Sequence, residues 1–159
     1  MHVKLPADKF AEIDIINLFE QGEGDVIEFP ESGFQVGDAL INGQKQNFAD
    51  YVLKNQLDTR LPLVADYNGA MVNISLQSID EEQKLVNFYA PVFSGVNYKQ
   101  AAPVNDYIKA FTKLLPEEGL NEKLFSCNCI LNYLYSELEG KKTGNLTGPI
   151  TFGEIAYQL

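Results

Sequence analysis

Apolar positions along the chain recur with two periods, and each change of period marks a predicted element. Spacings of three and four predict amphipathic helices, and they occur over residues 6–21, 47–57, 103–115 and 130–138. Strict alternation, or a short continuous apolar run, predicts a strand. Such runs cover residues 25–29, 34–41, 61–66, 71–76, 85–92 and the closing stretch 148–157.

One hairpin is expected in the middle of the chain. The first strand alternates apolar and polar residues, and only a few residues separate it from the next apolar run. We therefore expect segments 70–77 and 84–92 to pair as antiparallel strands, joined by the acidic turn Asp80-Glu81-Glu82.

Local signals punctuate the preceding stretch. Asn42-Gly43 is a strong turn signal, but it need not close a hairpin, because helical spacing resumes a few residues later. Asn47 is a suitable N-cap for that helix, since its side chain can accept a bond from the first turn. Gly37 lies inside the strand predicted over 34–41 and is placed there as a bulge.

Two stretches stay open at this point. Residues 93–102 fit either a strand or a loop. Residues 120–138 fit one long helix, but they also fit a strand followed by a helix, because no residue between them forces a break. Taken together, hairpins and segregated helices predict an α+β fold, with helices packed on a mainly antiparallel sheet. The length of 159 residues suits a single domain over 1–159.

The charge balance restricts the partners. The chain carries 22 acidic and 12 basic residues, a formal charge of −10. Nucleic acid and anionic membrane both attract clustered lysine and arginine, so neither is expected as a partner. The N-terminal residues lack the apolar core of a signal peptide, and no apolar run approaches the roughly 20 residues of a membrane span. We therefore expect a cytoplasmic protein.

Cys127 and Cys129 are the only cysteines. Residues two apart rarely meet disulfide geometry, so both thiols are expected to be reduced and mostly buried at the start of a helix. The only histidine is His2, and a zinc site would need further ligands near the cysteines. Phosphate-loop, dinucleotide and nucleophile-elbow patterns do not occur. We therefore predict no metal, no cofactor and no catalytic residues.

The C-terminal third resembles the C-terminal domain of FIST proteins, a family of predicted sensory input domains. The resemblance rests on Phe125-Ser126-Cys127, Glu137 and Gly153-Glu154-Ile155, which stand in the family's order and approximate spacing. More loosely, Leu61-Pro62-Leu63 looks like the family's middle region. Cys129-Ile130 stands where the family usually has Gly-Arg, so a guanidinium that could clamp a ligand carboxylate is missing there. The resemblance implies a small-molecule-binding sensory module in intracellular signal transduction, with an amino acid-like ligand and a partner protein for output.

We expect the ligand site at the junction of these motifs. Strand period points Glu154 inward, and a buried carboxylate needs hydrogen-bond donors. The amides of the turn at Ser126–Cys129 would supply them, at the edge of a pocket. The residues expected to bind the ligand are Ser126, Cys127, Asn128, Glu154 and Tyr157.

Two other classes of function stay open. One is a protein–protein interaction module without a ligand, for which an exposed apolar patch or a two-fold interface would speak. A homodimer stays open as its assembly. The other, weaker alternative is a thiol-dependent enzyme, which would need Cys127 paired with a base.

Overall fold

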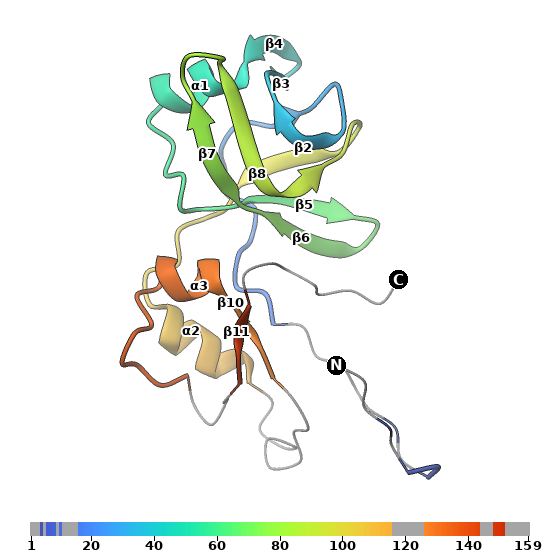
Figure 1. Cartoon of the computed structure of the whole chain (residues 1–159), viewed down its shortest axis with the longest axis vertical. Helices are drawn as coiled ribbons and strands as arrows, with labels where there is room; N and C mark the ends of the chain where they lie inside the picture. Colours follow the sequence, from blue (N-terminus) through green and yellow to red (C-terminus); the bar gives the residue numbers. More distant parts are fainter. Residues whose placement is uncertain are drawn as a thin grey trace.

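The computed structural model describes residues 4, 6–8, 10, 16–115, 126–143 and 148–151, with Leu131 described by its backbone alone. Figure 1 shows a β-rich body above a smaller C-terminal part that holds α2, α3, β10 and β11. The strands are β1 (Ile27–Glu28), β2 (Gly33–Val36), β3 (Asp38–Ile41), β4 (Gln44–Asn47), β5 (Leu63–Tyr67), β6 (Ala70–Ile74), β7 (Leu76–Asp80), β8 (Leu85–Val92), β9 (Asn97–Gln100), β10 (Asn128–Cys129) and β11 (Ile150–Thr151). The helices are α1 (Phe48–Lys54), α2 (Tyr107–Leu114) and α3 (Ile130–Tyr135).

The β-rich body is a small closed barrel of antiparallel strands. One sheet runs in the order β4-β3-β1-β9-β5-β6 and the other in the order β2-β8-β7. Single residues connect the two sheets: Gly37 lies between β2 and β3, and Ser75 lies between β6 and β7. Following the pairings from β1 through β9, β5, β6–β7, β8 and β2–β3 leads back to β1. The ring is therefore complete. Of the strands in the two barrel sheets, β4 alone lies outside it, paired with β3.

The chain bends sharply where it passes from one sheet to the other. At Gly37, the side-chain amide of Asn47 donates to the carbonyl oxygens of Gly37 and Lys84, at 2.9 Å each. The side-chain oxygen Oδ1 of Asn47 accepts from the backbone N–H of Asp50 and so also caps α1. The Asn47 side chain thus holds the bend at Gly37 and caps α1.

Side chains fill the barrel, and α1 supplies several of them. Phe48 is fully buried and packs edge to face against Phe29, with ring centroids 5.2 Å apart. Phe88 and Tyr98 extend this aromatic cluster on either side of Phe29. Small barrels generally have interiors filled by side chains. We therefore look for a ligand site outside the barrel interior.

The C-terminal part has its own small core. Tyr107 and Phe111 from α2 pack with Leu138, and half-buried Ile16 and Leu18 complete the cluster. β10 and β11 form a short parallel pair beside α3. A third cluster joins the barrel to this part, in which Phe19 packs edge to face on Tyr135 at 5.6 Å between centroids.

The structure confirms an α+β chain built mainly on antiparallel sheet. α1 packs on barrel strands, whereas α2 and α3 belong to the C-terminal part. The assignment of residues 1–159 to a single domain stays a prediction. Within the described residues, no helix has the length and apolar character needed to cross a bilayer.

Several predicted strands are correct in place but not in pairing. The strand expected over 70–77 divides at Ser75, so β6 pairs with β5 and only β7 pairs with β8. The hairpin expected with 84–92 therefore forms only in its second half, around a turn at residues 81–84. The strand expected over 34–41 divides in the same way at Gly37. In both cases the strand changes the strand with which it pairs, and the alternation of apolar and polar residues along the chain does not predict such a change.

The predicted helix cap and turn are confirmed. Asn47 caps α1 as predicted. Asn42-Gly43 closes the β3–β4 hairpin, with φ of 49° and 79°, and so does more than the expected turn. Residues 97–100 of the open stretch form β9.

The predicted helix over 6–21 is wrong at its C-terminal end, where residues 16–20 form no helix. The side-chain amide of Asn17 donates to the side-chain oxygen of Asn73 at 3.1 Å, and the side-chain amide of Asn73 donates to the side-chain oxygen of Asn17 at 2.8 Å. These bonds hold the segment extended beside β6. Residues 11–15 of that prediction lie outside the described residues.

The helices of the C-terminal part are shorter than predicted. α2 begins at Tyr107 instead of Pro103, because Asp106 is its N-cap and accepts from the backbone of Lys109. Cys129 is extended, with φ −74° and ψ 139°, so a single helix across this point is excluded in favour of strand followed by helix. α3 ends at Tyr135, and residues 116–125 lie outside the described range.

Candidate functional site

Three of the predicted ligand-binding residues lie together in the C-terminal part, after α2 and at the start of β10. Ser126 and Cys127 lead into β10, and Asn128 is its first residue. The Asn128 backbone N–H donates to the Pro149 carbonyl at 3.1 Å, and the Thr151 hydroxyl donates to the Asn128 carbonyl at 3.2 Å. Backbone groups of this segment are thus used to hold β11 in place.

Gly148 fits against this segment because it has no side chain. A Cβ there would lie 2.9 Å from Ser126 Oγ and closer still to the Ser126 backbone, far inside contact distance. Close approach of two backbones is a common reason for glycine in a strand-like segment. The predicted residue Ser126 therefore has a packing role in the described structure.

Glu154 and Tyr157 lie outside the described residues. The expected contact between Glu154 and the Ser126–Cys129 turn stays a prediction. The helix that was to provide the donors, α3, has six residues, and its N-cap Cys129 makes no side-chain capping bond.

The cysteines are reduced, as predicted, but the expectation of burial is wrong for Cys127, which is exposed. Cys129 is half-buried. Cys127 precedes the short strand β10 and lies outside the buried clusters of the fold. Within the described residues, no hydrogen bond or ion pair involves the Cys127 thiol, and no group of three or more metal-ligating side chains occurs.

Asn128 connects this segment to α2. Its side chain hydrogen-bonds the hydroxyl of Tyr107, which is buried. Burial raises the pKa of Tyr107 to about 12, and the hydrogen bond with Asn128 acts in the opposite direction. The amide side chain of Asn128 thus also carries a hydrogen bond within the C-terminal part.

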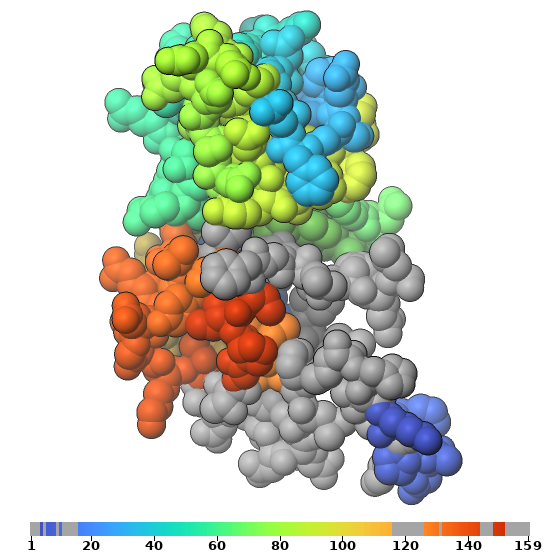
Figure 2. Space-filling view, viewed as in Figure 1, coloured from blue at the N-terminus to red at the C-terminus, as the bar shows by residue number. Residues whose placement is uncertain are grey.

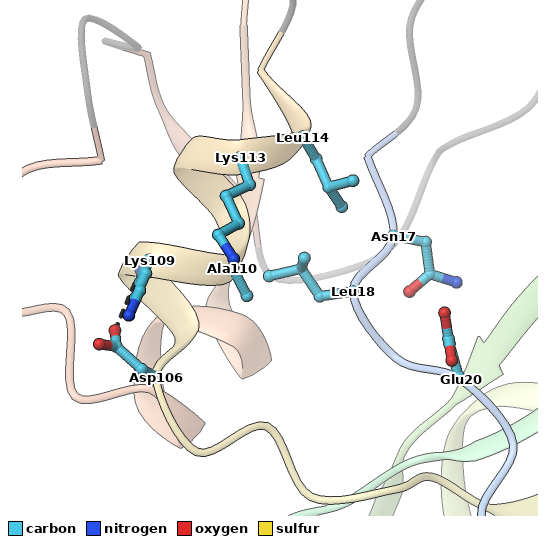
Figure 3. Close-up of a pocket in the computed structure, with 8 residues that line it drawn as sticks. All are labelled: Asn17, Leu18, Glu20, Asp106, Lys109, Ala110, Lys113 and Leu114. Atoms are coloured by element: carbon cyan, nitrogen blue, oxygen red, sulfur yellow. Dashed lines mark hydrogen bonds between the residues drawn. The ribbon is translucent and has the colours of Figure 1, made fainter.

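An open groove lies between α2 and the extended segment 17–20 (Figure 3). Its volume is about 380 Å³, within the lower range of small-molecule sites. The residues that line it are Asn17, Leu18, Glu20, Asp106, Lys109, Ala110, Lys113 and Leu114. We call it the α2 groove.

The α2 groove combines an apolar floor with charges of both signs. In Figure 3 Leu18 points across the groove toward Ala110 of α2, and Leu114 points from the end of α2 toward the facing segment. Lys109 and Lys113, four residues apart on α2, are exposed on one face of the helix, and neither takes part in the ion pairs described, which are Lys45–Asp38, Arg60–Asp58 and Lys84–Asp50. Glu20 supplies a carboxylate from the facing segment.

This groove was not predicted from the sequence. One wall lies in the segment 6–21, which was wrongly predicted as a helix at its C-terminal end, and the other wall, on α2, is about 90 residues away along the chain. The signal in the sequence was the pair Lys109 and Lys113 beside Leu114. It gives one face of α2 a mixture of charged and apolar side chains.

A second hollow occurs at the junction of the barrel and the C-terminal part. It is lined by Phe19, Arg60, Pro62, Asn73, Ser75 and Asn132, and its volume is about 10 Å³. That is about the space of one water molecule. Arg60 lies over the Tyr135 ring at 5.8 Å, and Asp58 accepts from its guanidinium, so this region joins the two parts of the molecule and is too small for a ligand.

The remaining tyrosines of interest belong to the barrel. Tyr98 is fully buried, its hydroxyl lies 2.7 Å from that of Tyr67, and it accepts from the backbone of Phe93. Burial raises the pKa of Tyr67 well above its ordinary value. These groups are bonded to each other and serve the fold.

The fold and the groove define a barrel-based α+β protein with a C-terminal appendage and a mixed-charge surface groove. Over residues 1–159 the chain matches the sequence profile of a family of unknown function, DUF6976, and it belongs to that family. No curated protein and no solved structure matches the chain.

Proposed function

We propose that this protein is a small-molecule-binding sensory module of intracellular signal transduction, with the α2 groove as its ligand site and a partner protein as its output. The observation that carries the proposal is the groove itself. Its apolar side chains lie between the α2 wall, which carries the exposed Lys109 and Lys113 together with Asp106, and the facing segment, which carries Glu20. Pockets of this kind bind small molecules by burying apolar atoms and orienting them with a few polar groups. The cytoplasm is the proposed compartment.

The charges of the groove support a ligand that carries both signs. Lys109 and Lys113 would bind a carboxylate, and Glu20 would bind an ammonium group on the opposite wall. Leu18 and Leu114 would contact an aliphatic or aromatic side chain. An amino acid-like ligand meets these requirements, and the resemblance to the FIST C-terminal domain points to the same class.

The residues predicted from that resemblance form a separate candidate. Ser126, Cys127 and Asn128 belong to β10 and the residues just before it, and with Glu154 and Tyr157 they remain our prediction for an alternative binding position of the same ligand class. Asn128 contacts Tyr107, which is buried, whereas the groove is lined by other residues of α2. Variants can therefore address the two positions independently.

A thermal-shift screen with the free amino acids tests the proposal. A ligand at ten times its Kd stabilises the folded state by about 1.4 kcal/mol, which corresponds to a rise in Tm of roughly 3–6 °C for a chain of this length. Lys113→Met should abolish the rise, whereas the matched control Lys142→Met, an exposed lysine of the C-terminal part, should keep it. If Ser126→Ala abolishes the rise and Lys113→Met does not, the ligand binds at the alternative position. No rise with any amino acid would refute the proposal.

An interaction module without a ligand is the second candidate. Leu134 on α3 is 62% exposed and Ile150 on the adjacent β11 is 39% exposed. Apolar side chains exposed on neighbouring elements suit contact with a protein partner. A failed ligand screen together with a partner captured in a Leu134-dependent manner would favour this candidate over the first.

A further inference from the structure

The central part of the outer face of the β2-β8-β7 sheet carries no charge. Its residues are Phe34, Gln35, Gln77, Ser78, Asn87 and Tyr89, and we call this set the uncharged face. Asp80, the last residue of β7, lies at its edge and faces the same way. Figures 1 and 2 show these three strands on the surface of the barrel that is turned toward the viewer. In a chain with a formal charge of −10, six neighbouring surface residues without a charge form a distinct surface, although Asp80 lies at its edge.

Two irregularities in strand pairing shape the uncharged face. The register of β2 against β8 shifts between Gly33 and Gln35, and that of β7 against β8 shifts between Leu76 and Ser78. Phe34 lies inside the first shift, opposite residues 88–91 of β8, and Gln77 is the extra residue inside the second. Both Phe34 and Gln77 are exposed. Bulges redirect side chains and are common next to functional sites. Here two of them flank the same stretch of β8.

A fixed row of polar side chains crosses the three strands. The Gln35 amide donates to the Asn87 carbonyl oxygen at 2.9 Å, and the Asn87 amide donates to Ser78 Oγ at 3.0 Å. These bonds leave some donors and acceptors of the row available. The Ser78 hydroxyl can still donate its hydrogen, and the side-chain oxygen of Gln35 can still accept a bond. Donors and acceptors are thus held in place at the surface.

Two aromatic side chains accompany this row. Phe34 is 59% exposed and Tyr89 is 46% exposed, although burial of such side chains is strongly favourable. Sugar rings present an apolar C–H face and a rim of hydroxyl groups. Exposed aromatic rings match the first feature, and oriented amides and hydroxyls match the second. The lack of charge matches a ligand that is itself neutral.

We propose that the uncharged face binds a neutral oligosaccharide. Phe34 and Tyr89 stack against sugar rings, and the Gln35–Asn87–Ser78 row hydrogen-bonds their hydroxyl groups. A protein partner fits this face less well, because a stable interface takes about 20–30 residues on each side and the row of polar groups occupies the middle of a much smaller area. The proposal is independent of the α2 groove.

The test uses isothermal titration calorimetry of the full chain with four neutral hexasaccharides: maltohexaose, cellohexaose, chitohexaose and mannohexaose. At least one should bind, and Phe34→Ala and Tyr89→Ala should each weaken its binding at least tenfold. Met71→Ala, which removes another exposed apolar side chain of the barrel, should bind like the wild type. Binding should also be nearly unchanged between 50 and 500 mM salt, because no ion pair forms.

Circular dichroism should give the same Tm for the variants and the wild type, since Phe34 and Tyr89 are exposed. Should one variant fail to fold, Tyr89→Phe replaces Tyr89→Ala, keeps the ring, and should bind the sugar within about threefold of the wild type. The proposal is overturned if none of the hexasaccharides binds at millimolar concentration, or if Phe34→Ala and Met71→Ala bind equally well. It is also overturned if Phe34 proves instead to drive self-association measured by light scattering, without sugar binding.

Discussion

Phe48→Ala tests whether the barrel is closed around an aromatic core that α1 completes. Phe48 is fully buried and contacts the rings of Phe29, Phe88 and Tyr51, at 5.2, 6.2 and 6.1 Å between centroids. Truncating a buried phenylalanine costs about 3–5 kcal/mol in free energy of unfolding, and loss of aromatic pairs places this site in the upper half of that range. We therefore expect a loss of about 4 kcal/mol.

The loss can be measured by urea unfolding followed by circular dichroism. With a slope of about 2 kcal/mol per molar urea, the midpoint should fall by about 2 M, and Tm should fall by roughly 8–16 °C. Leu53→Ala is the matched control, because Leu53 lies on the same helix but is 43% exposed, and it should cost less than about 1 kcal/mol. Equal losses for the two variants would refute the reasoning, because α1 would then not be part of the core.

Three further predictions concern single side chains. Gly148→Ala should speed hydrogen exchange of the amides in β10, because the added Cβ would overlap the backbone of Ser126; unchanged exchange would contradict that packing. Tyr51→Phe should flatten the fall in stability below pH 4 and cost about 1 kcal/mol at neutral pH. The Tyr51 hydroxyl donates to Asp25 at 2.8 Å and lowers the pKa of that carboxyl, so this bond adds stability above the unfolded pKa of about 3.9 that is lost as pH falls through the folded value. An acid limb identical to that of the wild type would argue against it. Finally, Cys127 should react with a disulfide reagent as fast as a small-molecule thiol, since it is exposed, whereas two equally slow thiols per chain would show that it is covered.

Features that depend on neighbouring residues could be predicted from the sequence. Asn47 caps α1 because its side chain needs only the N–H of Asp50, three residues away. Asn42-Gly43 forms a tight turn because both residues tolerate positive φ. Most barrel strands also coincide with predicted apolar runs, since one side of each strand faces the filled interior. β4 was not predicted, and β9 lies in a stretch that was left open.

Pairing could not be predicted in the same way. The passage of the chain from one sheet to the other at Gly37 and Ser75 depends on which strands lie beside it in space. The extended course of residue 17 and its neighbours likewise depends on Asn73, which forms two amide bonds with Asn17. Tertiary hydrogen bonds outweighed a helical apolar period there.

The same distinction between local and tertiary features applies to the candidate sites. The proximity of Ser126 to Asn128 is a matter of sequence, but the bond of Asn128 with Tyr107 and the contact of Gly148 with Ser126 are not. The α2 groove joins two distant segments, and only the paired lysines of one wall were visible beforehand.

The most direct test of the proposed function is a titration of isotope-labelled protein with the amino acid that gives the largest thermal shift, followed by amide NMR signals. If the α2 groove is the ligand site, the largest shifts should map to Leu18, Ala110 and Leu114, which line it, and Lys113→Met should remove them. Shifts confined to Ser126–Cys129, or saturable binding that leaves the groove signals unmoved, would contradict the assignment.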